Sequence, residues 1–196
     1  MMLHPGAPPA PHDLWTAWSW EPGIVLPLVA AAGLYGTGLR ALWRAAGAGR
    51  GVRLREAAIF GLGWLTLVLA LVSPLHRLGE ALFSAHMIQH ELLMAVAAPL
   101  LVLGRPLVPF IWGLSPAARR AVGRWTGAPA VRGAWTVLTH PLAAWVLHAV
   151  AIWVWHLPSL YQASVRSDLV HALQHASFLG TGLLFWWSVL MRAWLR

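Results

Sequence analysis

The sequence predicts an all-α protein, a polytopic integral membrane helix bundle of about five transmembrane helices. Its composition is the first reason: 59% of the 196 residues are hydrophobic and only 10% are charged, whereas soluble domains carry about 25% charged residues. The mean hydropathy of +0.64 agrees. A further reason is that the apolar residues form five runs separated by short segments that carry arginine, a pattern typical of membrane topology.

Each of the five runs approaches the roughly 20 residues that a helix needs to cross a bilayer, although the second and fourth are short. They span residues 24–43, 57–72, 82–103, 141–157 and 169–191. The last run follows Ser167 and Asp168, which fit a helix N-cap. We expect one transmembrane domain, residues 24–196, after an outer leader, residues 1–23, that lacks the basic and apolar regions of a signal peptide.

The arginines predict the orientation of the bundle. All 14 basic residues are arginines, and the net charge is +8. If the N-terminus lies outside and the C-terminus inside, twelve arginines fall in inner segments and only Arg77 and Arg166 in outer ones. Because cytoplasmic segments of membrane proteins are enriched in basic residues, we expect a multi-pass protein of the bacterial inner (plasma) membrane. Its basic charge then reflects topology and the lipid bilayer, with no nucleic acid as partner.

The longest inner segment, residues 105–140, contains a helix signal of its own. Ser115 and Pro116 fit an N-cap followed by proline at the first helical position. Residues 117–125 then mix arginines with Val122 and Trp125. An interfacial helix on anionic headgroups is one interpretation of this stretch, and a solvated basic loop is the alternative.

Two histidine pairs indicate a metal site. His86 and His90 lie four residues apart near the start of the third run, and His171 and His175 repeat this spacing near the start of the fifth. Residues four apart share one face of a helix, and both helices would run inward from the outer surface. We therefore expect the two pairs to face each other, with His156 as a further ligand. Imidazole is a ligand for copper, zinc and iron, and the alternative is that these histidines form hydrogen bonds between helices.

Four further residues near this end of the bundle are candidates for auxiliary roles. Met87 and Met94 offer thioethers, which favour Cu(I), although packing is their alternative role. Glu91, expected to be buried, would either accept a hydrogen bond from a ligand imidazole or pair with an outer arginine. His76 lies in the short outer loop before the third run. The chain has no cysteine, so thiolate ligands and disulfides are excluded.

Two long segments resemble a known family. Residues 86–107, HMIQHELLMAVAAPLLVLGRPL, are similar to the third-helix signature of the CtaG family of cytochrome c oxidase assembly proteins, the caa3-associated kind. Residues 153–187 resemble its second signature, with a W-H-x-P element and an HxxxH pair, and WSWEP at 18–22 also fits. The resemblance, which covers about residues 18–191, implies a non-enzymatic membrane factor that works with oxidase subunit I or II.

This resemblance also carries the family's histidine positions over to His86, His90, His156, His171 and His175. The leading hypothesis is therefore copper delivery or insertion, with Cu(I) as the expected ion before zinc or haem. A haem-binding redox membrane protein and a metal-free scaffold for oxidase subunits are the alternatives. Family members usually continue for one or two more helices. No HExxH motif supports a hydrolase, because position 94 is methionine.

Overall fold

The structure is a computed structural model that describes residues 16–193, so most of the expected leader lies outside the described residues. The described part is helical and contains no strand, which confirms the all-α class. Its elements are α1 (Pro22–Ala46), α2 (Leu54–Leu71), α3 (Pro74–Ala81), α4 (Phe83–Glu91), the π-helix η1 (Leu92–Ala97), α5 (Ala98–Leu103), α6 (Leu107–Gly113), α7 (Pro116–Gly127), α8 (Pro129–Leu138), α9 (Pro141–Trp155), α10 (Pro158–Arg166) and α11 (Asp168–Ala193).

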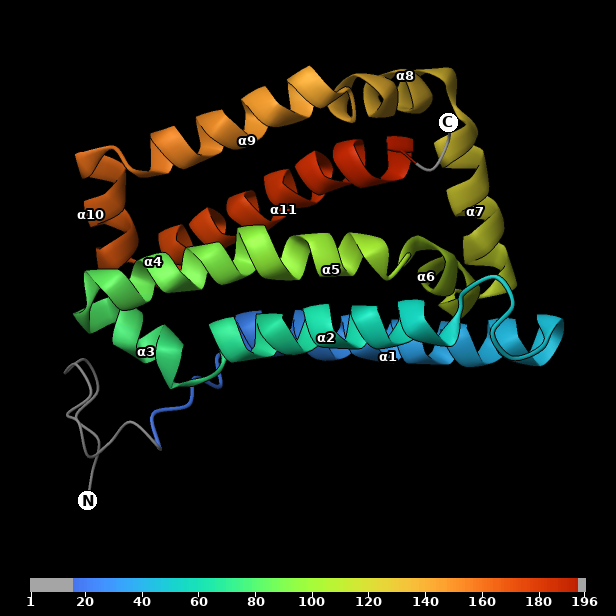
Figure 1. Ribbon diagram of the computed structural model, residues 1–196, viewed down its shortest axis with the longest axis horizontal. Helices are drawn as coiled ribbons and strands as arrows, with labels where there is room; N and C mark the ends of the chain where they lie inside the picture. Colours follow the sequence, from blue (N-terminus) through green and yellow to red (C-terminus); the bar gives the residue numbers. More distant parts are fainter. Residues whose placement is uncertain (1–15, 194–196) are drawn as a thin grey trace.

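The long helices lie side by side in layers (Figure 1). α1 and α2 form one layer, and α2 packs against the continuous helix formed by α4, η1 and α5. This helix packs in turn against α11, and α11 packs against α9. The helix α4–η1–α5 is the most buried of the three apolar helices: half of its most apolar stretch is buried, compared with 17% for α1 and 22% for α2. It is therefore the central helix of the bundle.

A π-helical segment interrupts this central helix. Within η1, the Ala98 backbone N–H donates to the Leu93 carbonyl five residues earlier. In the same register the Met94 carbonyl would need the N–H of residue 99, which is a proline and has none. The Trp186 indole on α11 supplies the missing donor: its Nε1 donates to the Met94 carbonyl at 2.8 Å. The π-helix therefore ties the central helix to α11.

The two ends of the bundle differ in character. One end, which we call the histidine end, holds α3, α10 and the first turns of α4 and α11 (Figure 1). The other, the arginine end, holds the α1–α2 connection and α6–α7, where most of the arginines lie. Gly38 allows close packing of α1 on α6 there, since a Cβ at this position would lie 1.8 Å from the Pro109 carbonyl oxygen.

Helix starts agree with the expected caps. The Ser115 hydroxyl accepts a hydrogen bond from the Ala118 N–H at 3.2 Å, and Pro116 begins α7. The helix predicted at residues 117–125 is thus confirmed, and the loop alternative is wrong. The Ser167 hydroxyl accepts from the Val170 N–H at 3.5 Å at the start of α11.

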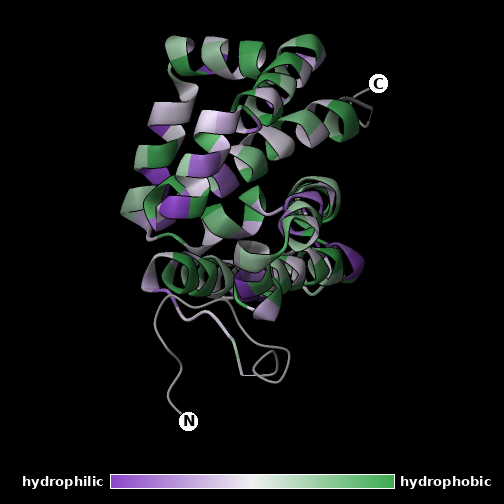
Figure 2. Cartoon of the chain, turned by 90° about the vertical axis from the view of Figure 1, so that its left-hand side faces the viewer, coloured by the Kyte–Doolittle hydropathy of each residue, from purple (hydrophilic) through white to green (hydrophobic). Residues whose placement is uncertain are grey.

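Three helices in the described part are long and apolar enough to cross a membrane, namely α1, α2 and the helix Phe83–Leu103. A fourth span arises if α8 and α9, bent by 68°, are counted together. α11 is 26 residues long but is not among them, and the polar residues of its first turns lower its hydropathy. Five spans and the orientation therefore stay predictions. Figure 2 shows green, hydrophobic stretches in every layer of helices, interrupted by pale and purple, more hydrophilic ones.

Candidate metal centre

The two histidine pairs come together at the histidine end. The rings of His86 and His90 on α4 have centroids 4.3 Å apart, and those of His171 and His175 on α11 are 4.2 Å apart. Across the helices, His86 stacks on His171 at 5.2 Å and His90 lies 5.3 Å from His175. The predicted facing of the two pairs is confirmed. We call His86, His90, His171 and His175 the histidine cluster.

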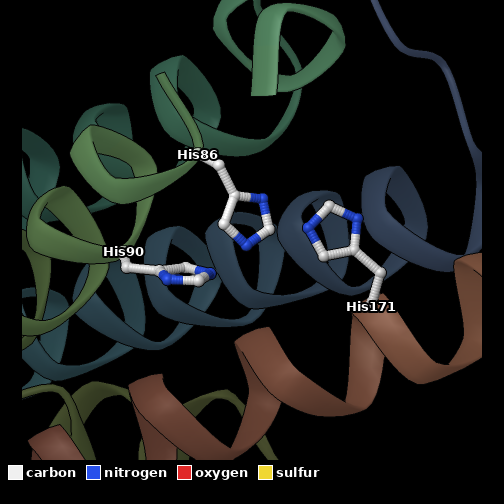
Figure 3. Close-up of side chains that lie close together, drawn as sticks. All are labelled: His86, His90 and His171. Carbon is white, nitrogen blue, oxygen red and sulfur yellow. The ribbon is translucent and has the colours of Figure 1, made fainter. Parts of the chain in front are cut away.

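Three members of the cluster converge most closely. His86, His90 and His171 each offer a ring nitrogen, and these three atoms lie within 4.8 Å of one another. Figure 3 shows the three rings pointing into a common space from α4 and α11. Nitrogens that share a tetrahedral metal at about 2.05 Å lie about 3.4 Å apart. The separations of up to 4.8 Å thus exceed this spacing by at most about 1.4 Å.

Several ring nitrogens of the cluster are buried and have no hydrogen-bond partner. His86 and His90 are each 2% exposed. The buried nitrogens without a hydrogen-bond partner are His86 Nε2, both nitrogens of His90, His171 Nε2 and His175 Nε2. Each buried polar group left unpaired costs about 1–3 kcal/mol. A bound ion at this place would satisfy several of them at once.

His76 joins the cluster from α3. It is 4% exposed, its ring stacks on that of His171 at 5.4 Å, and it lies 6.2 Å from that of His175. Burial, and after it the nearby positive charge of Arg77, lowers the pKa of His76 to about 4. His76 is therefore neutral near pH 7. Its sequence position in a short loop gave no sign of this burial.

Gln89 fixes the tautomer of His76. The fully buried amide donates from Nε2 to the Ala70 carbonyl at 2.8 Å and shares a 2.9 Å hydrogen bond with His76 Nδ1. The carbonyl can only accept, so the amide NH₂ faces it and also donates to His76. The His76 proton is then on Nε2, which lies 3.7 Å from Glu21 Oε1.

Gln89 and Gln174 are site residues that the sequence reasoning missed. Gln174 is fully buried, and neither its Nε2 nor its Oε1 has a hydrogen-bond partner. A signal was present, because α4 and α11 carry the same pattern, H-x-x-Q-H, at residues 86–90 and 171–175. Recognising this repeat would have placed both amides beside the histidines.

His156 lies at the margin of the cluster. It is exposed at the end of α9, and its Nδ1 is 2.7 Å from the Ile152 carbonyl oxygen. Its ring centroid is 6.2 Å from that of His90. The structure thus places His156 next to the cluster without bringing it among the three converging nitrogens.

The auxiliary candidates Glu91, Met87 and Met94 differ in their burial. Glu91 is exposed, so the expected burial beside the cluster is wrong. The buried face of α4 is formed by Ala85, His86, Gln89 and His90. At about 100° per residue, Glu91 falls on the opposite side of the helix. Met87 is half-buried, whereas Met94 is buried within η1, where its carbonyl accepts from Trp186. Thioether ligation by either methionine stays a prediction.

Comparison with known proteins supports one family. The family model described as cytochrome c oxidase caa3 assembly factor (Caa3_CtaG) matches residues 33–195. Uncharacterised proteins of Mycobacterium bovis and Mycobacterium tuberculosis are each 29% identical over 198 residues, 93% of this chain and 28% of theirs. A Mycobacterium leprae protein is 28% identical over 136 residues, 66% of this chain and 21% of its own.

The chain thus spans less than a third of the length of these curated relatives. No solved structure matches it. The family match covers most of the chain and includes the whole histidine cluster, η1 and all of α11. This protein belongs to the family of cytochrome c oxidase caa3 assembly factors.

Proposed function

We propose that this assembly factor binds copper as Cu(I) in the histidine cluster and delivers it to subunit I or II of the oxidase. The observation that supports this is the convergence of His86, His90 and His171, whose buried nitrogens lack hydrogen-bond partners. Delivery of this kind is ligand exchange, and it requires no catalytic turnover. The protein then acts as a copper chaperone and is not an enzyme.

The chemistry of the cluster favours a soft ion of low charge. The three converging ligands are neutral imidazoles, which suit copper and zinc and not the oxygen-seeking magnesium or calcium. Taking an ion out of water into a buried site is expensive, and by the Born relation this cost grows with the square of the charge. A monovalent ion is therefore easier to hold here than Zn²⁺ or Cu²⁺. Three ligands also leave room for the incoming ligand of a recipient.

The two other hypotheses account less well for the geometry. A haem held by two histidines needs them on opposite faces of the porphyrin, but the rings of His86 and His171 are stacked with centroids only 5.2 Å apart. A metal-free scaffold would be expected to pair its buried imidazoles with hydrogen-bond partners between helices. The unpaired nitrogens of the cluster speak against that role.

In the bacterial plasma membrane, we place the histidine end on the outer side, as the arginine distribution indicates. The N-terminus is then outside and the C-terminus inside. The cluster lies near the outer surface of the bilayer in this orientation, where a recipient domain can approach it. Cysteine accessibility labelling of single-cysteine variants in intact cells tests the orientation, because the natural chain has no cysteine.

Metal analysis of purified protein tests the proposal. We expect about one copper ion per chain in protein purified without chelators, since three nitrogens converge on one point. A quadruple alanine variant of His86, His90, His171 and His175 should lose this copper. His140→Ala is the matched control, because His140 is exposed at the opposite end of α9. Full copper retention in the quadruple variant would overturn the site, and a Soret band would favour the haem hypothesis.

A further inference from the structure

A small cavity lies beside the histidine cluster. Its volume is about 10 Å³, which is room for one ion or one water molecule. His171 and His175 line it, and the Nε2 atom of each is buried without a hydrogen-bond partner. Glu21 and Asp168 supply carboxylates to the same cavity. Two acidic side chains therefore share this cavity with two histidines that each have an unpaired ring nitrogen.

The lining of the cavity changes with depth. The Glu21 side chain is 42% exposed, and Asp168 is exposed at the start of α11. His171 and His175 are only 9% and 6% exposed. An ion that arrives from solvent thus meets carboxylates first and imidazoles after them.

Glu21 is held over the cavity by specific contacts. Its Oε1 accepts a hydrogen bond from the Ser19 hydroxyl at 3.2 Å and lies 3.7 Å from His76 Nε2. His76 carries its proton on this nitrogen, because Gln89 donates to the other one. His76 is thus a positioning residue for Glu21. Ser19 and Glu21 both belong to the WSWEP element at residues 18–22. These contacts therefore explain what two residues of that element do in the structure.

Charge distinguishes this cavity from the rest of the molecule. The chain has a net charge of +8 and only six acidic residues, yet two of the six line this one small cavity. Arg77, which acts electrostatically on His76, offsets part of their charge. Carboxylates at the mouth of a low-dielectric site attract cations and raise their association rate.

We propose that this cavity is the loading port of the histidine cluster. Glu21 and Asp168 attract the cation, the Nε2 atoms of His171 and His175 receive it, and it then passes to the converging nitrogens of His86, His90 and His171. The transfer exchanges ligands on Cu(I) without a change of oxidation state. The port rests on the proposed copper-binding function and adds a kinetic role for the two carboxylates.

Loading kinetics test the port. Full-length protein in detergent is mixed with Cu(I), supplied as its acetonitrile complex, in an anaerobic stopped-flow instrument at low salt. The Glu21→Gln/Asp168→Asn double variant should load about fivefold more slowly, the effect of two charges removed at about 8 Å in water. The difference should disappear at about 0.5 M salt, because screening suppresses long-range attraction. Copper stoichiometry should stay unchanged.

Glu91→Gln is the control for carboxylate removal as such, because it removes an exposed carboxylate that does not line the cavity. An unchanged loading rate in the double variant at low salt would overturn the port. Loss of copper stoichiometry would also overturn it, since the carboxylates would then be permanent ligands. Wild-type protein that binds no Cu(I) at all would instead refute the proposed function itself.

Discussion

The two H-x-x-Q-H segments have the same residues at the same spacing but different surroundings. In the first, residues 86–90 on α4, the amide of Gln89 is bonded to the Ala70 carbonyl and to His76. In the second, residues 171–175 on α11, the amide of Gln174 is equally buried and has no partner for either atom. Within the described part of the chain both segments keep unpaired polar atoms, Gln89 Oε1 among them. The difference is that the amide nitrogen of Gln89 is bonded to α2 and α3, whereas the amide of Gln174 has no such contact.

This difference shows that a local pattern does not determine the role of its residues. The first segment contributes two of the three converging nitrogens, from His86 and His90, and the second contributes one, from His171. The fourth histidine, His175, is not among the three; its ring lies 5.3 Å from that of His90, and it lines the cavity together with His171. We infer that the first segment is the preorganised half of the site and that the second exchanges ions with the outside.

Single histidine variants test this division most strongly. His90→Ala should lower the Cu(I) affinity by more than the roughly 10–100-fold that is typical of losing an outer-shell partner. His175→Ala should lower it by about tenfold or less, because His175 is not among the three converging residues. Competition titration with a chromogenic Cu(I) chelator measures both affinities. Equal losses in the two variants would show that all four histidines bind at once.

The two glutamines test the same comparison through stability. Gln89→Leu would leave the Ala70 carbonyl and His76 Nδ1 buried without a donor, so it should destabilise the apoprotein by about 2–4 kcal/mol. Gln174→Leu removes two unpaired polar atoms from a fully buried side chain and should be neutral or stabilising by about 1 kcal/mol. Equilibrium unfolding in mixed micelles measures both changes. Destabilisation of similar size in both would mean that Gln174 has a partner.

The part of the site that the sequence predicted follows from helix geometry alone. Histidines four residues apart must share a face, and two helices that run in the same direction bring their starts to the same depth. This reasoning was sufficient for His86, His90, His171 and His175. It failed for Glu91, which was expected to be buried because of its depth, although its angular position after His90 turns it away from the buried face.

The remaining features depend on contacts between distant segments. His76 reaches the cluster because α3 folds back against α4. The spacing of residues along a helix does not predict such a contact between two helices. The long helices were predictable from apolar runs, but the π-helix was not, and neither were the short helices α3, α6, α8 and α10 in the connecting segments. The π-helix arises where Pro99 lacks an N–H and where Trp186, 92 residues away from Met94, supplies the missing donor.

Trp186 joins the helices that carry the two segments, and its substitution is the test with the smallest expected effect. Trp186→Phe keeps an aromatic ring and leaves the Met94 carbonyl without its indole donor. We expect a loss of about 1–2 kcal/mol in unfolding free energy. If the bond also fixes the register of His86 and His90 against His171, the Cu(I) affinity should fall severalfold in the same variant. Trp187→Phe is the control, because Trp187 lines a pocket at the arginine end and packs edge-to-face against Trp135 on α8 instead. If both substitutions lowered the Cu(I) affinity equally, the hydrogen bond to η1 would have no specific effect on the metal site.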